Sequence, residues 1–498
     1  MDAAFALLPL ILVVALMTFA RWPAAAAGLV GAVTALLVAI LHFDYRGSGE
    51  MGLLSSTAGL VAEATFLSMT ILWIVFPALC LHELQVKSGA TATLRQGLSG
   101  ITRDPQLGAL LIAFFFALFF EGAAGFGTPV ALAAPLLVGL GFTPVRALTL
   151  TLIGHSIGVS FGAVGTPVLV QTGPWSELEL SGTIALMHAA LGWTMAVWVY
   201  RLAAHEPFVE PGSWRQLRWP LLAAASFLLP YAVIALWVGP ELPTLGGALL
   251  GGCVFALCVR ARSTGQLTSI PASAWIRAAL PYLLLLVLIL VTRLLPPVRE
   301  ALMSVQLSWT IAEYFRGSIQ PLYHPGTLLM LCFLASGLMR RTSRGDMQSA
   351  ASSAMRRLPL VLLSLIAMLV LARVMLHAGM IHTLALAVAH GAGQAWPLLA
   401  PATGALGTFI TGSATASNIL LTELQVATAN TLELPVVTMV AAQAFGAAVG
   451  NIICPHNIIA GSATVGLVGR EGEVMKKTLT ACAVYAALGG VLVFLLVR

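Results

Sequence analysis

The amino-acid sequence predicts an all-α polytopic membrane protein with about 12–14 membrane segments, in two inverted repeats that contain discontinuous or re-entrant helices. The chain of 498 residues is 59% hydrophobic and only 9% charged, with a mean hydropathy of +0.95, whereas soluble domains carry about 25% charged residues. Apolar runs of about 18 or more residues, long enough to cross a bilayer, recur along the chain. Two of these runs are interrupted by short glycine-rich or polar stretches.

The two halves are expected to form one membrane domain. Residues 1–260 make the N-terminal half with a break at 121–129, and residues 261–498 make the C-terminal half with a break at 411–418. Apolar runs place membrane segments at 4–20, 23–41, 65–81, 107–140, 148–170, 183–200, 219–238, 245–258, 279–295, 327–339, 358–376, 396–410, 436–453 and 479–497. Residues 296–324 mix charged and apolar side chains and are expected to lie partly along the membrane surface.

Basic residues are concentrated in short loops between the apolar runs, around 87–103, 201–218, 260–277 and 340–357. This distribution is typical of cytoplasmic loops, so the net charge of +6 does not indicate nucleic-acid binding. The six cysteines are scattered, and they form neither a disulfide framework nor a zinc-binding spacing. We interpret them as packing residues.

The first break reads Glu121-Gly-Ala-Ala-Gly-Phe-Gly-Thr-Pro129 and lies between two apolar runs. Glycine and proline weaken a regular helix, and non-helical backbone at membrane depth survives only where it is buried or lines a cavity. A carboxylate in this setting usually marks a transport path. The alternative is a turn at the membrane surface with an exposed Glu121.

The second break reads Thr411-Gly-Ser-Ala-Thr-Ala-Ser-Asn418. Each break is followed by an apolar run with spaced glycines and then by a polar segment that contains proline, Gly165-Thr-Pro167 in one half and Cys454-Pro-His-Asn457 in the other. Paired interruptions of this kind point to a transporter's binding site, because half-helix N-termini carry partial positive charge that suits a carboxylate. The alternative is that the small residues serve only close helix packing.

Several charged and titratable residues could take part in transport. Glu121 is the leading proton carrier, because a carboxyl group away from water binds its proton more tightly. His155 and His456 are further candidates, since each falls within a repeated motif. Arg373 lies deep in an apolar run and needs a partner, either a substrate carboxylate or an acid such as Glu121. For Arg293, close to a proline pair, snorkelling to the surface is an equally good interpretation.

The motifs Glu121–Pro129, Gly412–Asn418, Asn451-Ile-Ile-Cys-Pro-His-Asn457 and Ser462-Ala-Thr-Val-Gly-Leu-Val-Gly-Arg-Glu-Gly472 resemble those of the bacterial L-lactate permease family. The resemblance covers nearly the whole chain. It implies a cytoplasmic-membrane transporter that imports small 2-hydroxymonocarboxylates, namely L-lactate, D-lactate and glycolate, with protons. His155-Ser156 and Ala414 depart from the pattern of some members, which puts the exact substrate in doubt.

Sequence and resemblance together predict a proton-coupled symporter in the bacterial inner membrane, with a small carboxylate substrate and the lipid bilayer as partners. Homo-oligomerisation is left open, and no nucleic acid, metal or cofactor beyond the coupling proton is expected. The expected substrate-binding residues are Gly122, Gly125, Gly127, Thr128, Ser413, Thr415, Ser417, Asn418, Arg373 and Asn457. The alternatives are an exchanger or carrier of another organic anion, a passive anion channel, and an intramembrane enzyme. The absence of H-E-x-x-H and G-x-S-x-G disfavours the enzyme.

Overall fold

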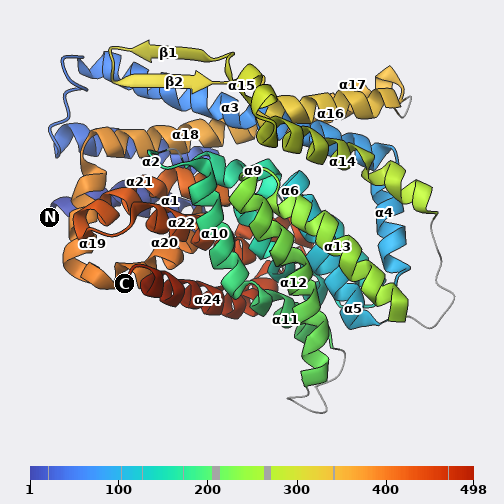
Figure 1. Cartoon of the computed structure of the whole chain (residues 1–498). Coiled ribbons are helices and arrows are strands. Elements are labelled where there is room, and N and C mark those ends of the chain that lie inside the picture. The colour runs from blue at the N-terminus through green and yellow to red at the C-terminus, as the bar shows by residue number, and fades with distance from the viewer. Residues whose placement is uncertain are drawn as a thin grey trace.

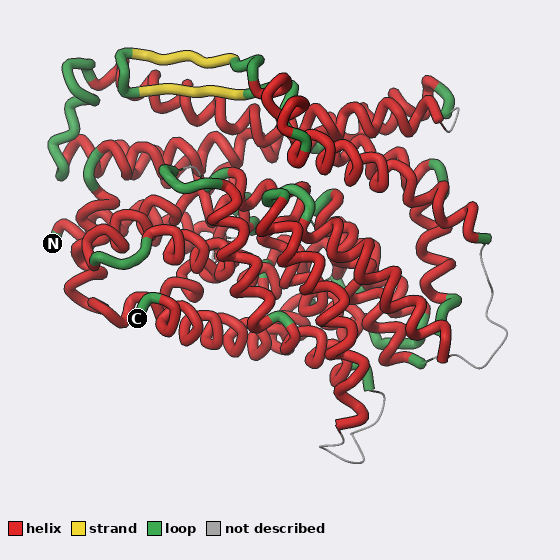
Figure 2. The backbone as a smooth tube through the Cα atoms, viewed as in Figure 1, coloured by secondary structure: helices red, strands yellow, loops and turns green. Residues whose placement is uncertain are grey.

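The computed structural model describes residues 1–18, 20, 22–102, 104–125, 127–171, 173–204, 214–262, 271–339, 342–468 and 470–498. Phe126 of the first predicted break, the basic residues Arg103, Arg340 and Arg341, Gly469 of the C-terminal motif, and the basic-loop stretches 205–213 and 263–270 lie outside the described residues. Most of what is described is helix, which confirms the predicted all-α membrane class (Figures 1 and 2).

The elements of the first half are α1 (Asp2–Thr18), α2 (Ala24–Leu41), α3 (Leu53–Lys87), α4 (Ala90–Ser99), α5 (Pro105–Ala109), the π-helical η1 (Leu110–Phe116), α6 (Ala117–Ala123), α7 (Thr128–Gly139), α8 (Pro144–His155), the 3₁₀ segment η2 (Ser156–Phe161), α9 (Gly162–Leu169), α10 (Glu177–Leu191), α11 (Trp193–Leu202), α12 (Trp214–Trp237) and α13 (Pro243–Arg262).

The second half contains α14 (Ala272–Leu294), α15 (Pro296–Met303), β1 (Leu307–Ile311), β2 (Phe315–Ile319), α16 (Pro325–Met339), α17 (Arg344–Met355), α18 (Leu358–His377), α19 (Met380–Ala392), the 3₁₀ segment η3 (Gly393–Ala395), α20 (Trp396–Thr411), α21 (Ala414–Leu432), α22 (Val436–Gly450), the 3₁₀ segment η4 (Asn451–Ile453), α23 (Pro455–Val465) and α24 (Glu471–Leu496).

The helices form two layers, and each layer mixes segments from both halves of the sequence (Figure 1). In the first layer α2 and α3 pack against α18, and α3 also packs against α16 and α17. The second layer contains α5–α13 and α20–α24, with α10 against α22 and α7 against α23. α21 meets α18 and α19, and so lies where the layers join. An inverted relation between the halves stays a prediction.

Among the described residues, ten helices are long and apolar enough to cross a membrane, or eleven if the bent pair α10–α11 counts as one span. Three shorter apolar helices, Asp2–Met17, Thr128–Gly139 and Pro325–Met339, accompany them. α3 is longer than the predicted span at 65–81, since it begins at Leu53 and continues past Pro77 to Lys87. Its 35 residues extend about 52 Å, well beyond a hydrocarbon core of about 30 Å.

The segment 296–324 contains a feature that the sequence did not predict. After α15, β1 and β2 form an antiparallel hairpin in which Trp309 lies opposite Gly317. Most of its side chains are exposed, but Phe315 is buried and stacks on His377 at 5.3 Å between ring centroids. A methyl group at Gly59 would overlap the Phe315 ring, so this glycine lets the hairpin dock on α3.

Both predicted breaks are confirmed as interruptions of helix. α6 ends at Ala123 and α7 begins at Thr128, while Gly125 and Gly127 have positive φ angles of 57° and 79°. α20 ends at Thr411, and Gly412 (φ 76°) precedes α21. These left-handed conformations favour glycine because they carry no steric penalty without a Cβ atom.

The predicted continuous helix at 148–170 is wrong in its middle. α8 ends at His155, a 3₁₀ segment follows, and Ala163, Val164 and Gly165 are left-handed at φ 42°, 55° and 80°. The segment 436–465 is interrupted in a similar way, because η4 and the extended residue Cys454 separate α22 from α23.

The spaced glycines of α22 allow it to pack closely on α20. A methyl group at Gly446 or Gly450 would overlap the backbone of Pro401 or Ala405, respectively, in α20. α20 and α22 therefore touch backbone to backbone, as small residues at a membrane helix interface allow.

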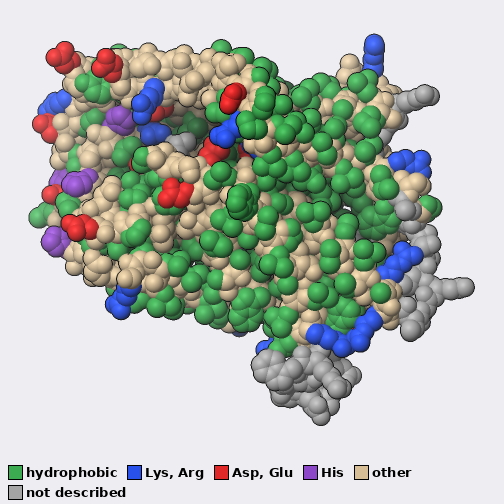
Figure 3. All heavy atoms as spheres, in the orientation of Figure 1, with side chains coloured by type: hydrophobic (Ala, Val, Ile, Leu, Met, Phe, Trp, Pro, Cys, Tyr) green, Lys and Arg blue, Asp and Glu red, His purple; other side chains and the backbone are tan. Residues whose placement is uncertain are grey.

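Charge is distributed unequally between the two ends of the helices. Figure 3 shows Lys and Arg side chains along the edge where α4, α13 and α17 lie, whereas Asp and Glu side chains, mixed with further Lys and Arg, gather toward the opposite edge. Arg260 and Arg262 lie in the last turn of α13, Arg344 begins α17 and Arg356 follows it. The positive-inside rule therefore places that edge in the cytoplasm. Both termini lie at the opposite edge (Figure 1).

Candidate functional site

The interrupted segments of the two halves meet at the start of α23. A methyl group at Gly127 would lie 3.3 Å from Oδ1 of Asn457 and 3.9 Å from Nε2 of His456. A methyl group at Gly412 would lie 3.5 Å from Cβ of His456. The first break and the second break therefore both contact the Cys454–Asn457 segment, although they are far apart in the sequence.

The 3₁₀ segment η2 reaches the second break from the other side. Val159 packs in one buried cluster with Ala414, the first residue of α21, and with Ala447 and Ala448 of α22. η2 also contacts η4. All four interruptions, two in each half, thus lie around one junction, which we call the helix-break junction.

Three helix N-termini point their first turns into this junction, those of α7 at Thr128, α21 at Ala414 and α23 at Pro455. Ser413 caps α21 by accepting a hydrogen bond from the backbone N–H of Ala416 at 3.5 Å. The N–H of Thr128 is already used, because it donates to the carbonyl oxygen of Gly125, and Pro129 and Pro455 have no N–H. The dipoles of these termini and their remaining N–H groups favour a bound anion. The junction is therefore suited to hold a carboxylate.

Two polar side chains of α23 differ in their exposure at the junction. Asn457 is 6% exposed, and its Nδ2 donates to Oδ1 of Asn451. His456 is exposed, although it lies beside both breaks. His456 thus lies at the outer side of the junction and Asn457 at its buried side. Thr128, at the start of α7, is buried.

Glu121, just before the first break, is buried. Its Oε2 is 3.9 Å from Nε2 of His155, and the two side chains are 6% and 1% exposed. The other ring nitrogen, Nδ1 of His155, is 2.6 Å from the carbonyl oxygen of Thr151. A methyl group at Gly162 would overlap Oε1 of Glu121, so the missing side chain there makes the space for the carboxylate. The alternative interpretation, a turn at the membrane surface with an exposed Glu121, is therefore wrong.

Several of the predicted substrate-binding residues contact protein groups in this structure. Ser417 donates to the carbonyl oxygen of Gly404 at 2.9 Å, and Asn418 donates to that of Pro167 at 2.8 Å. A methyl group at Gly122 would overlap the backbone of Leu245. Thr415 is buried in the first turn of α21. Ser417 and Gly122 thus serve helix packing here, whereas Gly125, Gly127, Thr128, Ser413 and Asn457 surround the junction.

Arg373 lies apart from Glu121 and has another acid as its partner. Its Nε is 3.7 Å from Oε2 of Glu63 in α3, and the two side chains are partly buried. Arg373 also lines a cavity with Asn418 and Glu423. The sequence predicts a substrate carboxylate or an acid such as Glu121 as the partner of Arg373, and the acid beside it in the structure is Glu63. Asn418 connects this cavity to the kink of α9 through its bond to Pro167.

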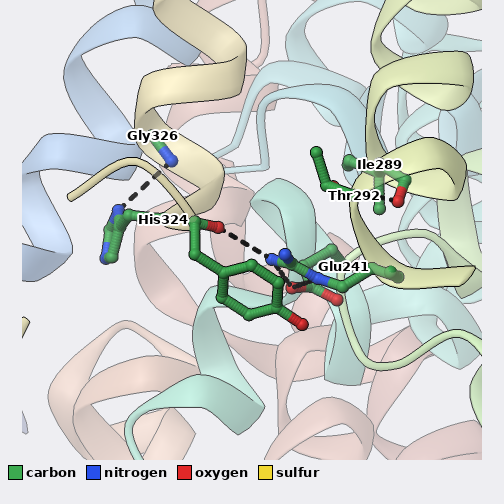
Figure 4. Close-up of polar contacts among 7 residues, drawn as sticks. Glu241, Ile289, Thr292, His324 and Gly326 are labelled. Carbon is green, nitrogen blue, oxygen red and sulfur yellow. Dashed lines mark hydrogen bonds and ion pairs between the residues drawn. The ribbon is translucent and has the colours of Figure 1, made fainter. Parts of the chain in front are cut away.

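A second ion pair was missed by the sequence reasoning. Nε and Nη2 of Arg293 lie 2.9 Å and 2.5 Å from Oε1 of Glu241, and the two side chains are 5% and 2% exposed (Figure 4). Arg293 therefore does not extend to the membrane surface, and its side chain is buried against Glu241. Glu63, inside an apolar run, could have been found as an intramembrane acid. Glu241 could not, because it follows Pro240 in a turn between two predicted spans.

Comparison with known proteins agrees with this architecture. The profile of the L-lactate permease family matches residues 2–498. The L-lactate permease of Streptococcus iniae is 30% identical over 87% of this chain and 92% of its own length. That of Bacillus subtilis is 29% identical over 96% and 93%. The glycolate permease GlcA of Escherichia coli is 28% identical over 99% and 95%.

Solved structures show a similar fold. The YdaH transporter of Alcanivorax borkumensis, described as having an unusual topology, aligns over 95% of this chain and 98% of its own, with a TM-score of 0.53 and 16% identity. MtrF of Neisseria gonorrhoeae, described within a class of antimetabolite efflux pumps, aligns over 97% of each chain with a TM-score of 0.51 and 14% identity. At such identities the likeness concerns the fold alone.

The match of the family profile over nearly the whole chain decides the assignment. Permeases are transporters and not enzymes, and the ten spanning helices indicate a multi-pass protein of the bacterial inner membrane. On these grounds the chain belongs to the L-lactate permease family.

Proposed function

We propose that this protein imports L-lactate and related 2-hydroxymonocarboxylates, D-lactate and glycolate, together with protons. The observation that carries the proposal is the helix-break junction, where three helix N-termini meet beside Asn457 while the buried Glu121–His155 pair lies behind the same break. The names of the relatives, L-lactate permease and glycolate permease, support the substrate class.

The substrate carboxylate would lie at the junction, where backbone N–H groups of α7, α21 and α23 carry partial positive charge. Its 2-hydroxyl group would be bound by Asn457 and His456, which face the same junction. An amide such as Asn457 can both donate and accept, so it matches a hydroxyl group that does the same. This arrangement would distinguish a 2-hydroxy acid from acetate.

The proton would be carried by Glu121. A carboxylate that is almost completely buried is costly unless it is protonated or paired. The ionisable side chain beside it is His155, whose Nε2 lies 3.9 Å from Oε2 of Glu121. This distance is longer than a hydrogen bond, so a proton would pass between them only after one side chain moves closer. Protonation of the pair would thus remove a buried charge, and its release on the cytoplasmic side would return the empty carrier.

The test is uptake of labelled L-lactate into proteoliposomes, with and without an inward proton gradient and with glycolate or acetate as competitor. We expect accumulation driven by the gradient, inhibited by glycolate and not by acetate. Glu121→Gln should abolish accumulation, whereas the control Glu179→Gln, at an exposed acid of α10, should accumulate normally.

Three outcomes would contradict the proposal. Flux without uphill accumulation would indicate a passive channel, and uptake only against internal lactate would indicate an exchanger. Full gradient-driven accumulation by the Glu121→Gln variant, with an unchanged pH dependence, would remove Glu121 as the proton carrier.

A further inference from the structure

The buried ion pair Glu241–Arg293 is the starting point (Figure 4). Arg293 also donates from Nη2 to the carbonyl oxygen of Tyr323 at 3.1 Å, and its guanidinium carbon lies 3.5 Å from the centroid of the Tyr323 ring. Two atoms of the pair, Oε2 of Glu241 and Nη1 of Arg293, are buried with no hydrogen-bond partner. A buried pair of this kind adds little net stability, so a positional role is the better explanation of its presence.

The pair joins the two layers of the molecule. Arg293 belongs to α14, and Tyr323 precedes α16, which packs on α3 in the first layer. Glu241 belongs to the short turn between α12 and α13 in the second layer. Residues 239–248, which contain this turn, are all buried. The ion pair therefore fastens a buried turn of the second layer to the first layer.

This turn packs directly on the interrupted helix α8–η2–α9. A methyl group at Gly165 would lie 2.5 Å from the carbonyl oxygen of Pro240 and 3.1 Å from the backbone nitrogen of Glu241. Oγ1 of Thr244 donates to the carbonyl oxygen of Gly158 at 2.6 Å. The turn thus contacts the 3₁₀ segment and the left-handed kink that follows it.

The kink in turn lies directly beside the Glu121 carboxylate. Gly162 borders the Glu121 carboxylate, and a methyl group at Gly125 would lie 3.1 Å from Cβ of Ala163. Ala163 and Val164 have positive φ angles, an unfavourable conformation for residues with a Cβ atom, and above all for β-branched valine. Such a conformation persists only where the surroundings impose it. The turn at Pro240 and Glu241 lies in direct contact with it.

We propose that Glu241 and Arg293 are positioning residues for the proton site, an inference that rests on the proposed function of Glu121. Their ion pair holds the 239–243 turn against Gly165, the turn holds the left-handed kink, and the kink sets the position of the Glu121 carboxylate relative to His155. The other charged or titratable groups around the ion pair are Glu177 at the start of α10, Arg299 of α15, and Tyr323 and His324 before α16.

The experiment removes the ion pair in proteoliposomes and follows the pH dependence of L-lactate uptake. The main variant is Glu241→Gln with Arg293→Met, because removing both charges leaves no uncompensated charge to unfold the protein. Gly165→Ala perturbs the same contact from the kink side. The matched control is Asp44→Asn, which removes the exposed ion pair with Arg46 and keeps a residue type tolerated at φ 48°.

We expect the double variant and Gly165→Ala to shift the midpoint of the pH profile by about one unit. The accumulation ratio should fall about tenfold, while the KM for lactate exchange stays within about twofold of the unmodified protein. The control should match the unmodified protein in all three. An unchanged pH profile with a maximal rate that falls only with the amount of folded protein would show a merely structural role and overturn the inference.

A second measurement does not depend on transport. Amide hydrogen exchange across residues 160–168 should be faster in the double variant than in the unmodified protein, because the kink loses its support. Equal protection in the two proteins would overturn the inference even if proton-driven accumulation were never observed. Loss of accumulation in the unmodified protein would instead contradict the proposed function, so the two failures are distinguishable.

Discussion

Gly162→Ala is the sharpest perturbation of the proton site. Gly162 has φ −67° and ψ 158°, a conformation open to alanine, so the substitution introduces no backbone strain. The new methyl group would overlap Oε1 of Glu121 and lie 3.1 Å from its Cδ. The carboxylate must therefore move away from its place beside His155.

The magnitude follows from the packing around the carboxylate. Glu121 and His155 are both buried, and the methyl group finds no open space on this side. An extra methyl group in a well-packed interior costs about 1–3 kcal/mol. If this cost falls on the protonation step, proton-driven uptake should drop roughly 5- to 150-fold. Lactate exchange that moves no net proton should drop less.

The assay is a double-mutant cycle of uptake in proteoliposomes. Glu121→Asp withdraws the carboxylate by one methylene group, so Gly162→Ala should harm the Asp variant much less than it harms the native protein. Gly139→Ala, where a methyl group meets no atom within 4 Å, is the control for alanine in place of glycine. Effects of Gly162→Ala and Glu121→Asp that simply add would refute the contact between the two positions.

Three further predictions concern other parts of the molecule. Asn457→Ala should raise the KM for lactate about fivefold, as the loss of one hydrogen bond of about 1 kcal/mol implies. It should also let acetate, which needs no hydroxyl ligand, compete more nearly on equal terms with lactate. An unchanged KM and unchanged discrimination against acetate would remove Asn457 as the hydroxyl ligand. Glu63→Gln should lower the free energy of unfolding by about 1–2 kcal/mol, because it leaves the Arg373 charge without its partner; the loss is smaller than for a fully buried pair. Adding Arg373→Gln should restore most of this free energy, as measured by thermal unfolding. Burial and the neighbouring Arg293 lower the pKa of His324 from 6.5 to about 4. The neutral His324 therefore contributes fully to stability above pH 6.5, and this contribution declines as the pH falls toward 4, because the unfolded chain binds the proton first. His324→Gln should make the free energy of unfolding less dependent on pH in this range, and an unchanged dependence would contradict the assignment.

The sequence was informative where a local rule decides the backbone. Glycines and an acid within one apolar run predicted the first break, and small polar residues within another predicted the second. The kink at Ala163 and Val164 could not be predicted, because neither residue favours a left-handed conformation and only tertiary contacts impose it. The ion-pair partners of Arg293 and Arg373 could not be predicted either, because only the tertiary fold brings them together. Glu241 lies 52 residues from Arg293 in the sequence, and Glu63 lies much farther from Arg373.

The geometry of the first break explains how a substrate and a proton could be linked. Gly125 faces Ala163 and the Glu121 carboxylate, while Gly127, two residues on, faces His456 and Asn457. A carboxylate bound at the N-terminus of α7 would act on Gly127 directly, and any resulting shift of the loop must also displace Gly125. Binding at one side and protonation at the other then bias the same short segment, and such a bias is reciprocal. A protonated Glu121 should therefore raise the affinity for lactate by the same factor as bound lactate raises the affinity of Glu121 for its proton.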